Sequence, residues 1–221
     1  SSVGKTNMLS DYAAIKNGSY GKLMEAYYAK QDAEKLSGKG DTSQKLTLMK
    51  TSADSLKKSA DALNDSSLWE KKKIKKKDEK TGEEIAVEDY DWDKITKAVK
   101  SFVEDYNDVV KEAGESNTKD VLRNASWMTG MTDKNSNMLA KIGITIGKGN
   151  KLELDEDALK QADISSLKTV FTGYNSLVSK ISQKATGISN AANRASATYT
   201  NNGTYSKTDS SLTSSKIDKE V

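Results

Sequence analysis

The residue types that most often carry enzyme chemistry are absent from this sequence or stand without the partners they need. The chain of 221 residues contains no histidine and no cysteine. It therefore lacks the commonest general base, the commonest metal-ligating side chain and a thiolate nucleophile. Serine is abundant, but no histidine is present to activate it. We predict that the protein is not an enzyme and has no catalytic residue, no metal site and no cofactor.

Two short stretches look like parts of ligand-binding loops. Val3-Gly4-Lys5-Thr6 has the end of a phosphate-binding loop, but the preceding glycine at the required spacing is missing, so a chance match is favoured. Asp155-Glu156-Asp157 is acidic enough to attract a cation, yet it lacks the alternating oxygen ligands and central glycine of a calcium loop. Capping of a helix N-terminus by Asp155 is the favoured interpretation.

The most concentrated charge lies in residues 68–92, LWEKKKIKKKDEKTGEEIAVEDYDW. The run Lys71–Lys77 is a candidate patch for nucleic acid or an anionic surface. The alternative is a solvated edge strand that lysines protect from pairing with other chains. We favour the second interpretation, because an acidic arm follows after one turn and opposes the lysine field. No nucleic-acid partner is expected from a net charge of +3.

The composition favours long helices with narrow apolar stripes. Charged residues make up 30% of the chain, apolar residues make up 35%, and proline is absent. Proline-free chains permit long uninterrupted helices, and a thin core suits an elongated bundle. No apolar run of about 18 residues occurs, so we expect no membrane span.

The clearest helix is predicted over residues 92–114. Its apolar positions are separated by alternating steps of four and three residues, as on a helix that packs lengthwise on other helices. Asp91 and Asp93 precede the repeat and favour its N-terminus, and Gly114 follows it as a C-cap. The repeat comprises Ile95, Val99, Phe102, Tyr106, Val109 and Ala113.

Similar repeats predict further helices at 43–64 and 165–198. The last repeat runs from Leu167 through Tyr174 to Tyr199 without a slip, so we expect one continuous helix there. Less regular patterns predict helices at 20–36, 119–131 and 133–140. We expect Leu56, Phe102 and Ile181 to share one core.

Alternating segments predict two β-hairpins, at about 69–90 and 142–154. In the first, Gly82 supplies the positive φ of a short loop, and the opposed arms carry opposite charges. The fold class is therefore mainly α, an elongated antiparallel helical bundle or coiled coil with two small β-hairpins. We expect a flexible segment at 1–19, a bundle domain at 20–200 with the 68–92 hairpin inserted, and a mobile polar tail at 201–221.

Several short motifs resemble, in their order, the C-terminal helical region of bacterial flagellar cap proteins, the hook-associated protein 2 family. They are Phe102-Val103 with Tyr106-Asn107, then the strand Leu139-Ala140-Lys141-Ile142-Gly143-Ile144-Thr145, then Leu152-Glu153-Leu154-Asp155-Glu156, and finally Val170-Phe171-Thr172-Gly173. The family usually carries large β-rich domains between its helical parts, whereas this chain has only the 68–92 hairpin there. The motif and core residues are Phe102, Tyr106, Asn107, Ile142, Gly143, Ile144, Leu154, Asp155, Phe171 and Gly173.

The resemblance implies a non-enzymatic structural or assembly protein with protein partners. Such a protein would self-associate or dock at a bacterial filament or cell surface, and would be secreted, on the cell surface or part of the flagellum. The alternative is a secreted or surface helical binding module unrelated to flagellar assembly, with the charged hairpin as its contact element.

The end of the last helix offers candidate interaction residues, because its stripe is regular but buries little area. These residues are Ala185, Ile188, Ala192, Ala195 and Tyr199. Ordering of this segment against other subunits is one interpretation. Coverage by residues 20–36 of the same chain is the other.

Overall fold

A computed structural model describes residues 40–203, with side chains described up to residue 198. The described part is mainly helical, as predicted. Its helices are α3 (Ser43–Asn64), α4 (Trp92–Gly114), α5 (Lys119–Lys134), α6 (Ser136–Ala140), α7 (Glu156–Gln161), α8 (Ile164–Phe171) and α9 (Leu177–Gly203), with 3-10 turns η1 (Ser66–Trp69) and η2 (Lys148–Asn150). Its strands are β1 (Lys72–Lys77), β2 (Glu84–Asp89), β3 (Ile144–Ile146) and β4 (Leu152–Leu154).

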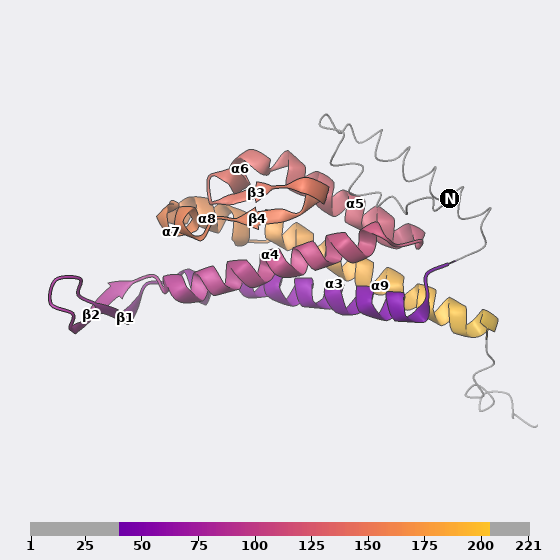
Figure 1. Cartoon of the computed structure of the whole chain (residues 1–221), viewed down its shortest axis with the longest axis horizontal. Coiled ribbons are helices and arrows are strands. Elements are labelled where there is room, and N and C mark those ends of the chain that lie inside the picture. Colours follow the sequence, from indigo (N-terminus) through magenta and orange to yellow (C-terminus); the bar gives the residue numbers. More distant parts are fainter. Residues whose placement is uncertain (1–39, 204–221) are drawn as a thin grey trace, which may run out of the picture.

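Three long helices lie side by side along the molecule (Figure 1). Helix α3 runs towards the β1–β2 hairpin and packs on both α4 and α9, which run back. Helix α5 then packs on α9 and α4, so these four helices contact one another in a ring. The predicted helices at 43–64 and 92–114 are confirmed in position and partners.

The core follows the predicted stripes. Leu56 is fully buried, and Phe102 and Ile181 are almost fully buried, each on a different long helix. All three belong to one apolar cluster that also takes in α5, α8 and the β3–β4 hairpin. The prediction of a shared core is therefore confirmed. A single narrow stripe per helix suffices because each faces the stripes of two neighbours.

The prediction of one continuous helix from 165 to 198 is wrong. Helix α8 ends at Phe171 and α9 begins at Leu177. Gly173 takes the left-handed φ of 95° between them, and its N–H donates to the Asn64 side chain at 2.7 Å. Tyr174, expected on the buried stripe, is 82% exposed. The break occurs because Gly173 readily adopts positive φ, while Ser176 accepts a hydrogen bond from the Ser179 N–H and caps a new helix.

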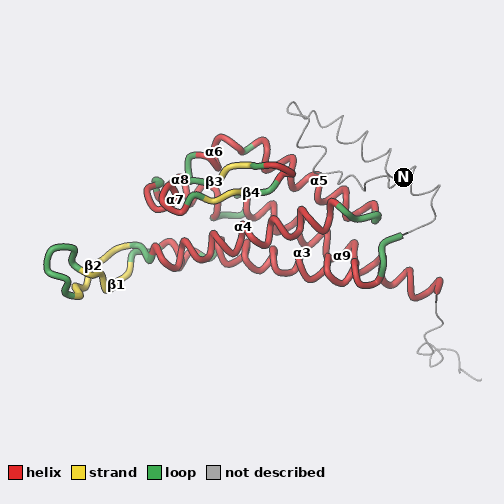
Figure 2. The backbone as a smooth tube through the Cα atoms, viewed as in Figure 1, coloured by secondary structure: helices red, strands yellow, loops and turns green. Residues whose placement is uncertain are grey.

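The first predicted hairpin is confirmed. Strands β1 and β2 pair antiparallel, and Gly82 takes a φ of 73° in the turn. The Asp78 carboxylate organises that turn by accepting hydrogen bonds from the N–H groups of Lys80 and Thr81. The hairpin projects beyond the end of the helical bundle (Figure 2).

The second predicted hairpin is also confirmed, and it lies over α4 beside the short helices α6, α7 and α8 (Figure 1). Its strands contain three residues each, joined by a turn in which Gly149 and Asn150 have positive φ. Ile144 is opposite Leu154, and its side chain is fully buried. The hairpin therefore adds its apolar residues to the bundle core.

The predicted N-caps occur where the sequence places them, with one shift at a C-terminus. Asp91 accepts a hydrogen bond from the Lys94 N–H, and Asp155 accepts from the N–H groups of Asp157 and Ala158. Asp155 is thus a helix cap, as favoured. Gly114 is the last residue of α4 rather than its C-cap, and Glu115 takes the C-cap position.

Several sequence predictions lie outside the described residues. They are the flexible segment 1–19 with its Val3–Thr6 stretch, the helix at 20–36 with its proposed packing, and the polar tail from residue 204 onwards. The proposed division into domains therefore stays a prediction. Among the described residues, none of the helices has the length and apolar character needed to cross a bilayer.

Candidate assembly site and the residues that build it

Asn107 fastens the β3–β4 hairpin to α4. Its side-chain amide donates to the Leu152 carbonyl oxygen at 2.9 Å, and its carbonyl oxygen accepts from the Leu152 N–H at 2.7 Å. This pair satisfies both backbone groups of a strand residue that has no other strand on that side. The neighbouring Tyr106 is fully buried and donates to the Thr132 hydroxyl at 3.0 Å. Burial raises the pKa of Tyr106 well above its usual range, so its hydroxyl stays protonated as a donor.

Gly143 lies where α7 packs closely on the start of β3. Its φ is 81°, and a Cβ there would lie 2.7 Å from the Asp155 carbonyl oxygen and 2.9 Å from the Leu159 nitrogen. The Asp155 N–H donates to the Gly143 carbonyl oxygen at 2.8 Å. Only glycine combines this backbone conformation with this close approach. The Ile142-Gly143-Ile144 motif therefore couples the hairpin to α7.

Phe171 joins the bundle end to the base of the β1–β2 hairpin. Its ring stacks on Trp69 with centroids 5.6 Å apart, and it meets Phe102 edge-on at 6.4 Å. Trp69 is held in turn by a hydrogen bond from its indole N–H to the Leu63 carbonyl oxygen at 2.7 Å. Aromatic pairs of this geometry add stability beyond the area they bury. The rings thus fix α3, α4 and α8 relative to one another.

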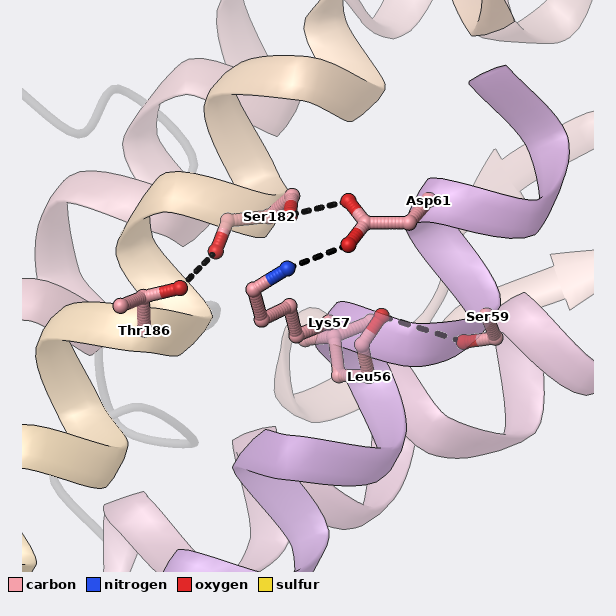
Figure 3. A network of polar contacts seen from close by, with 6 residues as sticks. All are labelled: Leu56, Lys57, Ser59, Asp61, Ser182 and Thr186. Carbon is pink, nitrogen blue, oxygen red and sulfur yellow. Dashed lines mark hydrogen bonds and ion pairs between the residues drawn. The ribbon is translucent and has the colours of Figure 1, made fainter. Parts of the chain in front are cut away.

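A polar seam between α3 and α9 repeats after seven residues. Asp61 is paired with Lys57 and accepts a hydrogen bond from Ser182 of α9 at 2.7 Å (Figure 3). One heptad away, Asp54 is paired with Lys50 at 2.7 Å and accepts from Ser189 at 2.6 Å. Lys50 and Lys57, Asp54 and Asp61, and Ser182 and Ser189 are each seven residues apart, which fixes the register of the two helices.

The seam lowers the pKa of both aspartate carboxyl groups. Burial alone would raise the pKa of Asp54, but hydrogen bonds from Lys50 and Ser189 outweigh it, so the pKa lies below its ordinary value. The same balance, with Lys57 and Ser182, lowers the pKa of Asp61. The seam is therefore held by charged carboxylates at neutral pH. Sequence reasoning missed it, although the seven-residue spacing of lysine, aspartate and serine was a signal that could have found it.

Asp41 ties the start of α3 to the connection between α4 and α5. Its carboxylate is only 5% exposed, and it accepts hydrogen bonds from the Ser116 hydroxyl at 2.7 Å, the Asn117 N–H at 2.8 Å and the Thr118 hydroxyl at 2.6 Å. Three donors satisfy a charge that would otherwise be costly to bury. Thr118 is at the N-cap position of α5, but its hydroxyl bonds Asp41 and makes no capping hydrogen bond to the helix. These hydrogen bonds join the start of α3 to the α4–α5 connection at the end of the bundle opposite the β1–β2 hairpin (Figure 1).

A comparison with known protein families matches the region that contains several of these contacts. Residues 116–220 match the family model described as Flagellar hook-associated protein 2 C-terminus. The match supports a relationship of this region to the C-terminal part of flagellar cap proteins. The match covers α5 to α9, and so includes the motif residues from Ile142 to Gly173. Searches of curated proteins and of solved structures gave no match.

The residues on which the resemblance to flagellar cap proteins rests lie mostly inside the molecule. Asn107 and Leu154 are half-buried, while Asp155 and Gly173 are exposed and act as a cap and a turn. The remaining members are buried, namely Phe102, Tyr106, Ile142, Gly143, Ile144 and Phe171. The structure brings these residues together as joints between elements. The buried members lie in the core as predicted, whereas Asp155 and Gly173 lie at the surface. A family role for these residues stays a prediction.

The candidate interaction residues of α9 lie along the bundle. Ala185, Ile188 and Ala192 are buried where α9 packs on α3 and α5, and Ala195 is half-buried. The side chain of Tyr199 lies outside the described part. Sequence reasoning did not assign α5 as a partner of α9. A role for these residues in contacts with other subunits stays a prediction.

Two exposed features stand out on the described surface of this chain. One is a groove of about 330 Å³ beside the α8–α9 connection, lined in part by Met131, Met138, Lys134 and Lys180. The other is the β1–β2 hairpin. Within the described residues, no cluster of three or more carboxylates has metal-binding geometry.

The β1–β2 hairpin keeps its charges in solvent. Lys75 and Glu84 form an ion pair at 3.4 Å with both side chains mostly exposed, and Lys76 pairs with Asp89. Because exposed ion pairs contribute little to stability, these contacts set the charge pattern of the surface more than they hold the fold. The groove has no such pattern of opposite charges, since its ionisable lining residues are lysines.

Proposed function

We propose that this protein is a non-enzymatic structural subunit that assembles through protein contacts at the outer tip of a bacterial flagellar filament. The observation that carries the proposal is the match of residues 116–220 to the C-terminal region of the flagellar hook-associated protein 2 family. In this proposal the helical bundle is the body of the subunit. The β1–β2 hairpin occupies the place where the family usually carries larger domains.

The geometry supports a structural role. The family motif residues act as joints, with Asn107 holding one hairpin and Gly143 admitting α7 at close range. A rigid body with interlocked elements suits a subunit that transmits its position to neighbours. The alternative of a surface binding module unrelated to flagella is not favoured by the family match.

The proposal is tested by locating the protein in the bacterium that encodes it. A short epitope tag is inserted at the exposed turn around Gly82, and cells are labelled with gold-conjugated antibody. The expected result is label at the free ends of flagellar filaments. A strain that lacks filaments serves as the control and should lose that label. Label spread evenly over the cell surface of both strains would contradict the proposal.

A further inference from the structure

The β1–β2 hairpin is a ribbon with one basic strand and one acidic strand. Strand β1, KKIKKK, carries five lysines, and β2, EIAVED, carries three carboxylates. Three of the six opposed pairs join a lysine to a carboxylate, and a fourth joins Ile74 to Val87. The two strands are thus complementary in charge and in apolar position.

Within residues 40–203, each strand of this ribbon has a strand neighbour on one side only. The sheet contains two strands, and the hairpin projects past the end of the bundle in Figures 1 and 2. The outer edge of β1 and the outer edge of β2 therefore both present backbone groups to solvent. Isolated two-stranded hairpins are marginally stable in water, so additional strands stabilise them.

One face of the ribbon carries its three large apolar side chains, together with Lys72, Lys76 and Asp89. Because directly opposed residues share a face, Ile74, Val87 and Ile85 lie on the same side. Ile85 is 42% exposed, and Ile74 and Val87 are only half-buried. Joining ribbons edge to edge would place these side chains next to their equivalents and remove apolar area from water.

We propose that the outer edge of β1 pairs antiparallel with the outer edge of β2 from a second copy of this chain. The intramolecular register can be reused, because Lys73 would then oppose Glu88 and Lys77 would oppose Glu84 of the second copy. In an antiparallel ladder, hydrogen-bonded and non-hydrogen-bonded pairs alternate. The backbone N–H and C=O groups on the outer edge of β1 therefore meet the corresponding groups on the outer edge of β2 in the second copy. Every side chain stays on the same face of the extended sheet.

Charge complementarity selects a second copy as the occupant. Lysines on an edge strand repel another lysine edge and discourage uncharged edges, but they attract an acidic edge. An acidic partner of another kind would satisfy β1 and leave the carboxylates of β2 unmatched. Copies of the same chain present both strands, so the basic β1 edge of one copy can pair with the acidic β2 edge of the next.

The pairing is heterologous, because β1 of one copy meets β2 of the next. Repetition of such a contact gives a ring when the rotation closes and a filament when it does not. This inference rests on the proposed function, since a subunit held at a filament tip gains effective concentration from its other contacts. The exposed charge pairs contribute little individually, so the contact is weak and is weakened further by salt.

The test exchanges the charges on one face of the ribbon. The exchange variant combines Lys73→Glu, Lys75→Glu, Lys77→Glu, Glu84→Lys and Glu88→Lys. Opposed pairs within each chain keep opposite charges, so the hairpin itself is retained. Separate batches of the full chain and of the variant are labelled with a donor or an acceptor fluorophore, and energy transfer is measured between batches of the same protein and between the full chain and the variant. A control variant exchanges only Glu79 and Lys80 in the turn.

Each protein alone is expected to associate, whereas the mixture should show association at least about tenfold weaker, because lysine then meets lysine between chains. The turn variant should mix freely with the original chain. Free mixing of the exchange variant with the original chain would overturn the inference.

A second variant does not depend on the altered hairpin folding. Residues 71–88 are replaced by a short glycine-serine linker, and retention of the bundle is checked by a cooperative thermal melt. Loss of association is expected. Unchanged association would overturn the edge pairing and leave the tip function intact, whereas failure of gold labelling at filament ends would refute the function and not the pairing.

Discussion

At the residue scale, Asn107 and Gly143 make contacts that few other side chains could make. Asn107 is the side chain that both donates to and accepts from the Leu152 backbone, and Gly143 combines positive φ with a backbone approach that excludes a Cβ. The sequence resemblance identified both positions as motif residues. It could not specify their roles, because each role depends on an element far away in the chain.

Replacing Gly143 with alanine should destabilise the protein by about 2–4 kcal/mol, through left-handed strain and the clash with the α7 backbone. Gly130 provides the matched control, because it lies within α5 and a Cβ added there would meet only open space. Gly130→Ala should stabilise by roughly 0.5–1 kcal/mol. Urea unfolding followed by circular dichroism measures both. Equal effects of the two substitutions would contradict the proposed close approach at Gly143.

At the element scale, regular stripes located α3 and α4 to the residue, and alternation located both hairpins. The same periodicity did not reveal the break between α8 and α9. A seven-residue repeat can continue through a turn when the apolar positions of the two flanking helices keep the same spacing. Gly173 and the capping residue Ser176 were the local signals of a break. The packing of α5 on α9 was not predicted, because it depends on tertiary contacts that no local sequence pattern records.

The seam between α3 and α9 should make stability depend on pH in the acid range. The pKa values of Asp54 and Asp61 are lowered from 3.8 on folding, so their contribution is present above that pH and is lost as the pH falls through the folded-state values. Both side chains are about half exposed, at 51%. After allowance for solvent screening, the two together contribute on the order of 1 kcal/mol.

Urea unfolding at about pH 6 and about pH 2.5 tests this seam. The combined variant Asp54→Asn and Asp61→Asn should be less stable than the original chain at the higher pH and similar at the lower pH. Substitution of Asp105 should change the free energy of unfolding in the opposite direction. Burial raises the pKa of Asp105, so its charged form disfavours the folded state. Asp105→Asn should therefore stabilise at the higher pH only. A seam variant whose deficit persists unchanged in acid would contradict this account.

At the scale of the whole molecule, four helices close a bundle, and two hairpins extend it in different ways. The β3–β4 hairpin is fastened to α4 and shares the core, whereas the β1–β2 hairpin projects beyond it with a basic and an acidic edge. The fold class was predictable because each stripe and alternating segment is local. The opposite charges of the two ribbon arms were predicted for the same reason, whereas the pairing of the α3 aspartates with the α9 serines became visible only when the two helices were placed together.

The proposed role as an assembling subunit requires self-association, which multi-angle light scattering of the full chain measures across a wide concentration range. We expect a monomer at low concentration and a larger species of defined mass as the concentration rises. Raised salt should shift that equilibrium towards the monomer, because the proposed contacts involve exposed charges. A constant monomer mass over the whole range, in low salt and with the bundle folded, would contradict the account.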